Sequence, residues 1–181
     1  MKTNVKEFEK THLFFVTSTV LKWIKLFNKK EFAQIVIDSL KYITEEDWIN
    51  IYAFVLMPNH IHLILKFSAN HTADQVFRDF HKFTSQQILK IMRKNHLALM
   101  NQFIVNKKDR KHQIWQREPK FKNVYSAEFL IQKAEYIHNN PIQSKWQLVE
   151  RVEDYLYSSA AYYLKGKPFT LFKLTDLREL F

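Results

Sequence analysis

The chain has 181 residues and a formal net charge of +10 at pH 7, and 46% of its residues are apolar. This length and composition predict one folded domain with a proper core and exclude an intrinsically disordered chain. The single glycine, Gly166, excludes glycine-rich phosphate loops, and the absence of cysteine excludes disulfides, thiolate zinc sites and cysteine nucleophiles.

The sequence shows no targeting or membrane-spanning segment. Residues 1–7 lack the apolar stretch of a signal peptide, and no apolar run approaches the roughly 20 residues that cross a bilayer. We therefore expect a cytoplasmic protein without a membrane partner. The expected organisation is one domain, residues 1–181, in which residues 145–181 form a C-terminal tail packed on the rest.

The first part of the chain alternates between strand and helix patterns. Runs of β-branched and aromatic residues predict strands, and apolar residues at helical spacing predict a helix between them. The predicted elements are a strand at 12–20, a helix at 29–45 that Asn28 can cap, a strand at 49–56, a turn at 57–59 and a strand at 60–67.

The second part is predicted less evenly. Thr72 can cap a helix that runs to about residue 93, with one stripe formed by Val76, Phe80, Phe83, Gln87 and Ile91. The later predictions are a loop, or a helix extension plus a loop, at 94–113, a weak strand at 114–124 that contains Pro119, a helix from Ser126 to Pro141 and a partly helical tail at 146–181. This order predicts an α+β fold of the split β-α-β, ferredoxin-like type, an antiparallel sheet with helices packed on one face.

The segment NHIHL at residues 59–63 is the most informative local pattern. Side chains alternate along a strand, so His60 and His62 project from one face with Cα atoms about 7 Å apart. Two such imidazoles can bind one divalent cation if other residues supply further ligands. The alternative is a pair of histidines on a half-exposed strand without a ligand.

The helix that ends at Pro141 has a second polar face. Leu130, Ala134 and Ile137 cluster on its apolar side, and Tyr136 lies away from them. Asn140 is one turn beyond Tyr136 on the same side, so the two present a hydroxyl and an amide oxygen together. The plainer interpretations are an aromatic residue at the edge of the core and a helix stop before proline.

Positive charge concentrates between residues 90 and 122, where ten Lys and Arg face only Asp109 and Glu118. Cations interleaved with aromatic rings suit nucleic acid, because they meet phosphates while the rings stack on unpaired bases. A solvated loop in a basic protein is the alternative. The candidate DNA contacts are Lys107, Lys108, Arg110, Lys111, Trp115, Arg117, Lys120 and Lys122.

Four segments, in the same order, resemble the single-tyrosine HUH transposases. Residues 57–63 (MPNHIHL) resemble the HUH motif. Residues 136–141 (YIHNNP) resemble the tyrosine-bearing helix, with an ending typical of the REP-associated tyrosine transposase (RAYT) branch. Residues 114–116 (IWQ) and 154–159 (DYLYSS) resemble a Trp-Gln strand entry and a late aromatic-Ser-Ser segment of the family.

The resemblance implies an HUH endonuclease-type fold and a specific chemistry. His60, His62 and Asn140 would hold Mg²⁺ or Mn²⁺, and Tyr136 would attack a phosphodiester of single-stranded DNA beside a hairpin. The product would be a 5′-phosphotyrosine and a free 3′-hydroxyl, which permits rejoining. A catalytically inactive nucleic-acid-binding module derived from such a transposase is the alternative. A monomer, with the tyrosine acting in cis, and a homodimer both remain open.

Overall fold

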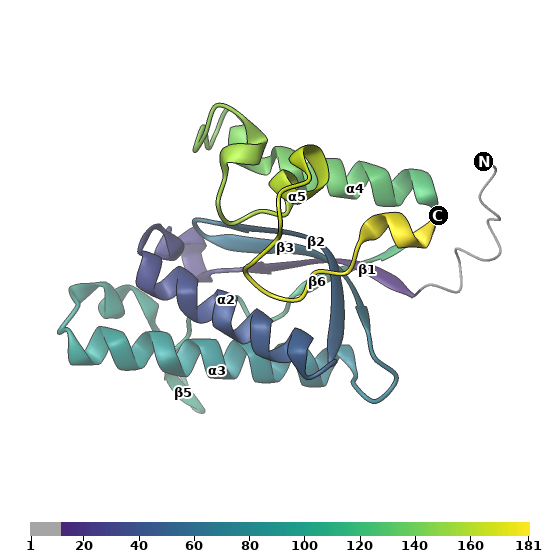
Figure 1. Cartoon of the computed structure of the whole chain (residues 1–181). Helices are drawn as coiled ribbons and strands as arrows, with labels where there is room; N and C mark the ends of the chain where they lie inside the picture. Colours follow the sequence, from purple (N-terminus) through teal and green to yellow (C-terminus); the bar gives the residue numbers. More distant parts are fainter. Residues whose placement is uncertain (1–11) are drawn as a thin grey trace.

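The computed structural model describes residues 12–181 and has a four-stranded antiparallel sheet in the order β2-β3-β1-β6 (Figure 1). Its strands are β1 (Leu13–Thr19), β2 (Ile49–Met57), β3 (His60–Phe67) and β6 (Lys120–Val124). The strand with the two histidines, β3, lies between β2 and β1. Residues 1–7, for which we expected no signal peptide, lie outside the described residues.

The central strands are buried on both faces, so the sheet needs cover on each side. On β3, Ile61, Leu63 and Leu65 belong to one apolar core, and Ile64 belongs to the other. By the alternation along a strand, His60 and His62 share the face of Ile64. The histidines therefore lie between the sheet and whatever covers that second face.

Helices α2 (Lys30–Glu45) and α3 (Ala73–Lys94) cover the face of Ile61 (Figure 1). Their apolar stripes, which include Phe32 and Phe80, pack into the core of that face. As predicted, Thr72 caps α3: its hydroxyl accepts from the Gln75 backbone N–H, and the Gln75 side chain accepts from the Thr72 N–H.

Helix α4 (Ala127–Asn139) covers the opposite face, where its Leu130, Ala134 and Ile137 join the core of Phe15 and Ile64 (Figure 1). The predicted α+β class and the antiparallel sheet with packed helices are confirmed. The prediction that all helices pack on one face holds for α2 and α3 and is wrong for α4, which packs on the other face. The reason is that a central strand with apolar residues on both faces requires a second layer.

The C-terminal part of the chain packs beside α4 and along β2. Residue 157 accepts from the Leu56 N–H through its carbonyl (2.9 Å), and the Ser159 N–H donates to the Phe54 carbonyl (3.0 Å). Beyond them lies the short helix α5 (Ala160–Lys165). Within residues 12–181, no helix is both long and apolar enough to cross a membrane.

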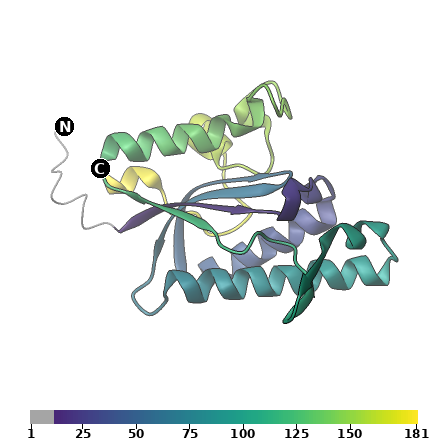
Figure 2. The same cartoon turned by 180° about the vertical axis from the view of Figure 1, so that it is seen from behind.

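Several local predictions are wrong. Helix α2 begins after Lys29, and Asn28 does not cap it because it ends a 3-10 turn, Leu26–Asn28, whose first two side chains are buried. Half-exposed Phe83 is not part of the buried α3 stripe. The predicted loop at 94–113 contains a 3-10 helix (Ala98–Phe103) and the hairpin of β4 (Ile104–Lys107) and β5 (Arg110–His112), which lies beside α3 (Figure 2).

Candidate active site

The two histidines of β3 lie together under α4. Their ring centroids are 4.6 Å apart, and His60 and His62 are 4% and 5% exposed. Their strand is fixed on both sides, since Thr17 of β1 and Val55 of β2 are the register partners of His62. Both rings are therefore held rigidly beside each other in a nearly dry layer.

The orientation of His60 is set by Asn59. The Asn59 side-chain amide N–H donates to the Trp23 carbonyl (2.9 Å), so its Oδ1 faces His60 Nδ1 at 2.7 Å. An amide oxygen only accepts, and His60 Nδ1 must therefore carry the proton. The lone pair of His60 is then on Nε2, which is the arrangement of a ring that binds a metal.

His62 has one satisfied and one free ring nitrogen. Its Nδ1 lies 2.7 Å from the Thr17 hydroxyl, and its ring stacks on Phe15 with centroids 5.2 Å apart. Its Nε2 is buried and has no hydrogen-bond partner in the part of the chain that the structure describes. An unpaired buried polar atom costs about 1–3 kcal/mol, so the site retains a group that the fold does not satisfy.

Asn140, just past α4, adds a second unsatisfied atom. The residue is fully buried, and its Oδ1 has no partner among the described residues. Its amide N–H reaches only the Tyr136 carbonyl, at 3.5 Å. Asn140 also acts on the pKa of His60, which places the amide beside that ring. Residues 12–181 contain no cluster of three His, Cys, Asp or Glu, so any third side-chain ligand has to be of another type.

Tyr136 completes the arrangement from the same helix. It is 38% exposed, and its ring meets His62 edge-on at 5.2 Å between centroids. Lys133, one turn earlier on α4, has its Nζ 5.8 Å from the Tyr136 ring centroid. The tyrosine thus lies at the open side of the histidine pair of its own chain.

Burial keeps both histidines neutral. It is the largest cause that lowers the pKa of His60 to about 4, with Lys145 acting in the same direction and Asn140 against it. Burial followed by the neighbouring His60, Lys145 and Lys133 lowers the pKa of His62 to about 2. Neutral imidazoles are the form that binds a cation, so both are ready as ligands at pH 7.

The predicted DNA contacts divide between two regions. Lys107, Lys108, Arg110 and Lys111 are exposed on the β4–β5 hairpin, and Arg117 is exposed on the segment after it. On β6, Lys120 and Lys122 are the register partners of Thr17 and Phe15, so they share the histidine face of the sheet.

Trp115 was predicted as a DNA contact, and its position in the structure contradicts this prediction. It is only 2% exposed, its indole N–H donates to the Thr84 hydroxyl (2.8 Å), and its ring stacks on His81 at 5.0 Å between centroids. Its partners are core residues of the α3 face. A ring held in this way is not available to stack on a base.

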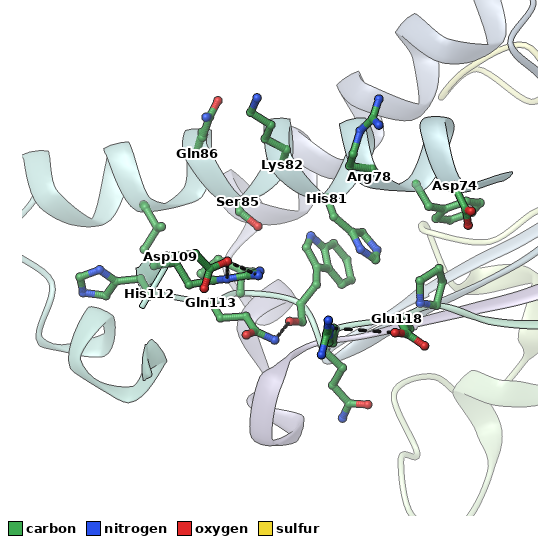
Figure 3. A pocket seen from close by; sticks show the side chains of 18 of the residues that line it. Asp74, Arg78, His81, Lys82, Ser85, Gln86, Asp109, His112, Gln113 and Glu118 are labelled. Carbon is green, nitrogen blue, oxygen red and sulfur yellow. Dashed lines mark hydrogen bonds and ion pairs between the residues drawn. The ribbon is translucent and has the colours of Figure 1, made fainter. Parts of the chain in front are cut away.

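A cavity of about 780 Å³ lies between α3 and residues 109–119, on the face opposite the histidine pair (Figure 3). Its charged lining is mixed. Arg78, Lys82, Arg110 and Arg117 are present together with Asp74, Asp109 and Glu118. This groove contains none of His60, His62, Tyr136 and Asn140, so it is separate from the candidate active site.

Two residues near the histidines were not singled out from the sequence. Lys133 could have been found, because a helical repeat places it, three residues before Tyr136, on the side of that residue. Trp23, whose ring centroid is 6.1 Å from that of His60, could not, because its position depends on a turn with positive φ. Such a turn has no signature in a segment without glycine or asparagine at that point.

The sequence motifs indicated a transposase family, and the comparisons with known proteins confirm it. The model of the IS200-like transposase family matches residues 9–140, and the chain belongs to this family. A solved REP-associated tyrosine transposase, bound to a REP hairpin, is 17% identical with a TM-score of 0.59 over 93% of this chain and 88% of that chain. This chain therefore shares the fold of that REP-associated tyrosine transposase.

A second solved structure, a candidate transposase from Deinococcus radiodurans, is 16% identical with a TM-score of 0.45, over 70% of this chain and 88% of that chain. A search of curated proteins found no match.

Proposed function

We propose that this protein is a metal-dependent enzyme that nicks and joins single-stranded DNA, with Tyr136 as the nucleophile. The observation that carries the proposal is the convergence of Tyr136 on two buried, unpartnered atoms, His62 Nε2 and Asn140 Oδ1. If these residues only stabilised the fold, we would expect both atoms to have partners, because each unpaired buried polar group lowers stability.

The donor set fits a divalent cation. His60 and His62 offer imidazole nitrogens whose Nδ1 atoms already have partners, and Asn140 offers an amide oxygen. A mixed nitrogen and oxygen set suits Mn²⁺ or Mg²⁺, and these three residues would hold it. When bound, such an ion neutralises and polarises the scissile phosphate as a Lewis acid.

The remaining chemistry belongs to the side chains. The Tyr136 oxygen forms a bond to phosphorus as the bond from phosphorus to the 3′-oxygen breaks, the phenol proton passes to solvent and the departing oxygen takes up a proton. Lys133, beside the Tyr136 ring, is placed to balance charge on the phosphate and on the phenolate. Attack by another 3′-hydroxyl on the phosphotyrosine restores a phosphodiester without ATP.

The substrate we propose is DNA that forms a hairpin next to a single strand. The neighbour of similar fold is bound to a REP hairpin, and the same class of DNA is the first candidate for this chain. Lys120 and Lys122 at the sheet edge would meet phosphates near the histidines. Lys107, Lys108, Arg110, Lys111 and Arg117 would meet phosphates farther away.

Tyr136 lies beside His62 of the same chain, which favours a monomer with the tyrosine in cis. We propose that the enzyme acts in the cytoplasm. The alternative, an inactive DNA-binding module, needs the basic residues but gains nothing from an unpartnered His62 nitrogen.

The test is a denaturing gel of the protein with labelled hairpin DNA from the flanks of its own gene, in Mn²⁺. We expect a shifted, protease-sensitive adduct that disappears with Tyr136→Phe or with EDTA and persists with Tyr125→Phe. Tyr125 is the matched control because it is an exposed tyrosine just before α4. Salt-sensitive binding with no adduct for the wild type would instead support the binding module.

A further inference from the structure

The turn after β1 presents a tryptophan in an unusual backbone conformation. Lys22 and Trp23 have φ angles of 54° and 57°, and Trp23 is 57% exposed. A left-handed conformation costs about 1–2 kcal/mol for a residue with a Cβ atom, and it is rare for a bulky side chain. Burial of the indole does not offset this cost, since most of the ring faces solvent.

The turn is held in place by the histidine hairpin. The Asn59 side chain donates to the Trp23 carbonyl, the Val20 N–H donates to the Asn59 carbonyl (2.8 Å) and the Phe27 N–H donates to the Pro58 carbonyl (2.8 Å). The same Asn59 side chain orients His60. One residue therefore fixes both the imidazole and the exposed indole, and backbone strain maintained by its surroundings is typical of binding sites.

A second indole lies on the same side of the histidine pair. The Trp146 ring centroid is 5.7 Å from that of His60, and the Trp23 centroid is 6.1 Å from it. The Nζ atoms of Lys25 and Lys145 lie 5.6 and 5.9 Å from the Trp146 ring centroid. Two indoles and two cations thus border His60, and Tyr136 borders His62.

We propose that Trp23 and Trp146 form a nucleobase-binding site for the nucleotide on the 5′ side of the scissile phosphate. The proposal rests on the proposed function, because it assigns a direction to the DNA strand across the active site. In an in-line displacement the attacking and leaving oxygens lie on opposite sides of phosphorus. With Tyr136 at the His62 end, the nucleotide that ends in the leaving 3′-oxygen lies at the His60 end, beside the indoles.

The site has a clear role after cleavage. The nucleotide with the new 3′-hydroxyl has no covalent link to the protein, whereas the 5′ phosphate is bonded to Tyr136. Stacking on an indole retains that end, and Lys25 and Lys145 can meet its phosphates. Because every base has a flat face, this contact accepts any base and orients the strand without specifying its sequence.

The test uses a trinucleotide of thymidine carrying the fluorescent base 2-aminopurine at its 3′ end, mixed with the full chain in EDTA. Stacking quenches 2-aminopurine, and we expect quenching with the wild type and affinity about tenfold weaker with Trp23→Ala. Trp23→Phe should retain part of the affinity. Tyr42→Ala, which removes an aromatic ring of similar exposure from α2, should bind as the wild type does.

The position of the probe tests the direction of the strand. The same trinucleotide with 2-aminopurine at its 5′ end should be quenched less, and Tyr136→Phe should change neither signal. Equal quenching at both ends, or wild-type affinity in Trp23→Ala, would overturn the proposal. Because this assay needs no metal and no cleavage, it separates failure of the indole site from a wild type that forms no tyrosine adduct.

Discussion

Each face of the sheet carries a histidine that stacks on an aromatic ring, His81 on one face and His62 on the other, and the two differ in whether the Nε2 atom has a partner. On the α3 face, His81 has its Nε2 2.9 Å from the Ser18 hydroxyl and stacks on Trp115. On the α4 face, His62 contacts the adjacent β1 residue, Thr17, but its Nε2 has no partner in the described chain. Burial lowers the pKa of His81 to about 3 and that of His62 to about 2.

This difference shows that neither burial nor a lowered pKa marks a site by itself. Both rings are neutral and stacked on an aromatic side chain, yet only His62 is next to a second unpartnered atom, on Asn140. On the α3 face, His81 Nε2 has the Ser18 hydroxyl as its partner, and the ring adds to the packing of that core. On the α4 face, His62 Nε2 and Asn140 Oδ1 are unsatisfied at a cost of about 1–3 kcal/mol each, which a bound ligand would recover.

The largest expected effect is on stability, and it distinguishes Trp115 on the α3 face from Trp23 beside the histidines. Trp115→Ala leaves a cavity in the α3 core and removes the hydrogen bond from the indole N–H to the Thr84 hydroxyl, so we expect a loss of about 3–5 kcal/mol in the free energy of unfolding. Trp23→Ala on the histidine side should change it by less than about 1 kcal/mol, because the ring is exposed. Urea unfolding measures both, and similar losses for the two would show that Trp23 is structural.

Histidine substitutions should separate the faces in a second way. His62→Ala should weaken Mn²⁺ binding about 100-fold, as judged by isothermal titration, because one proposed ligand is lost. His81→Ala should leave Mn²⁺ affinity unchanged and lower stability by about 2–4 kcal/mol. Unchanged Mn²⁺ binding in His62→Ala would exclude it as a ligand.

The histidine hairpin and the tyrosine helix were predictable because each obeys a short-range rule. Period two placed His60 and His62 on one face, and the helical repeat put Asn140 on the side of Tyr136. The motifs in their order then indicated the family. These relations are local, and the folded structure preserves them because the strand and the helix that carry these residues are regular.

What could not be predicted depends on which segments meet in space. Trp115 sits in a basic window, and only the distant His81 and Thr84 show that it is a core residue. The placement of α4 on the second face follows from strands that are apolar on both sides, which alternation alone does not reveal. Trp23 is presented by a positive-φ turn that Asn59 holds from another strand.

The pH dependence of stability should come partly from the α3 face. His81 is neutral when folded, with a pKa lowered to about 3, whereas its pKa when unfolded is about 6.5. Between these values the unfolded chain binds more protons, so the stabilising contribution is full above pH 6.5 and is lost as the pH falls toward 3. Each pH unit in this range costs about 1.4 kcal/mol per such histidine.

Urea unfolding of the wild type and His81→Gln between pH 6.5 and 4.5 measures this contribution. The variant should lose less stability per pH unit than the wild type. Equal slopes would show that His81 is protonated in the folded state or does not titrate in this range, which would contradict its burial as the cause of the lowered pKa.

The smallest expected effect is on DNA binding, and it distinguishes Lys120 from Lys111, which lie on different sides of the sheet. Lys120 on β6 is the register partner of Thr17 on β1 and shares the histidine face, whereas Lys111 is on the β4–β5 hairpin beside α3. Substituting either by alanine should weaken binding of single-stranded DNA a few-fold and reduce the slope of log affinity against log salt by about 0.7, the value for one phosphate contact. Only Lys120→Ala should also slow adduct formation at saturating DNA, since its phosphate contact would lie next to the reacting group. If both variants formed the adduct at the wild-type rate, the charge of Lys120 would contribute to DNA affinity alone. The two faces would then differ only in that one of them holds the histidine pair and the tyrosine.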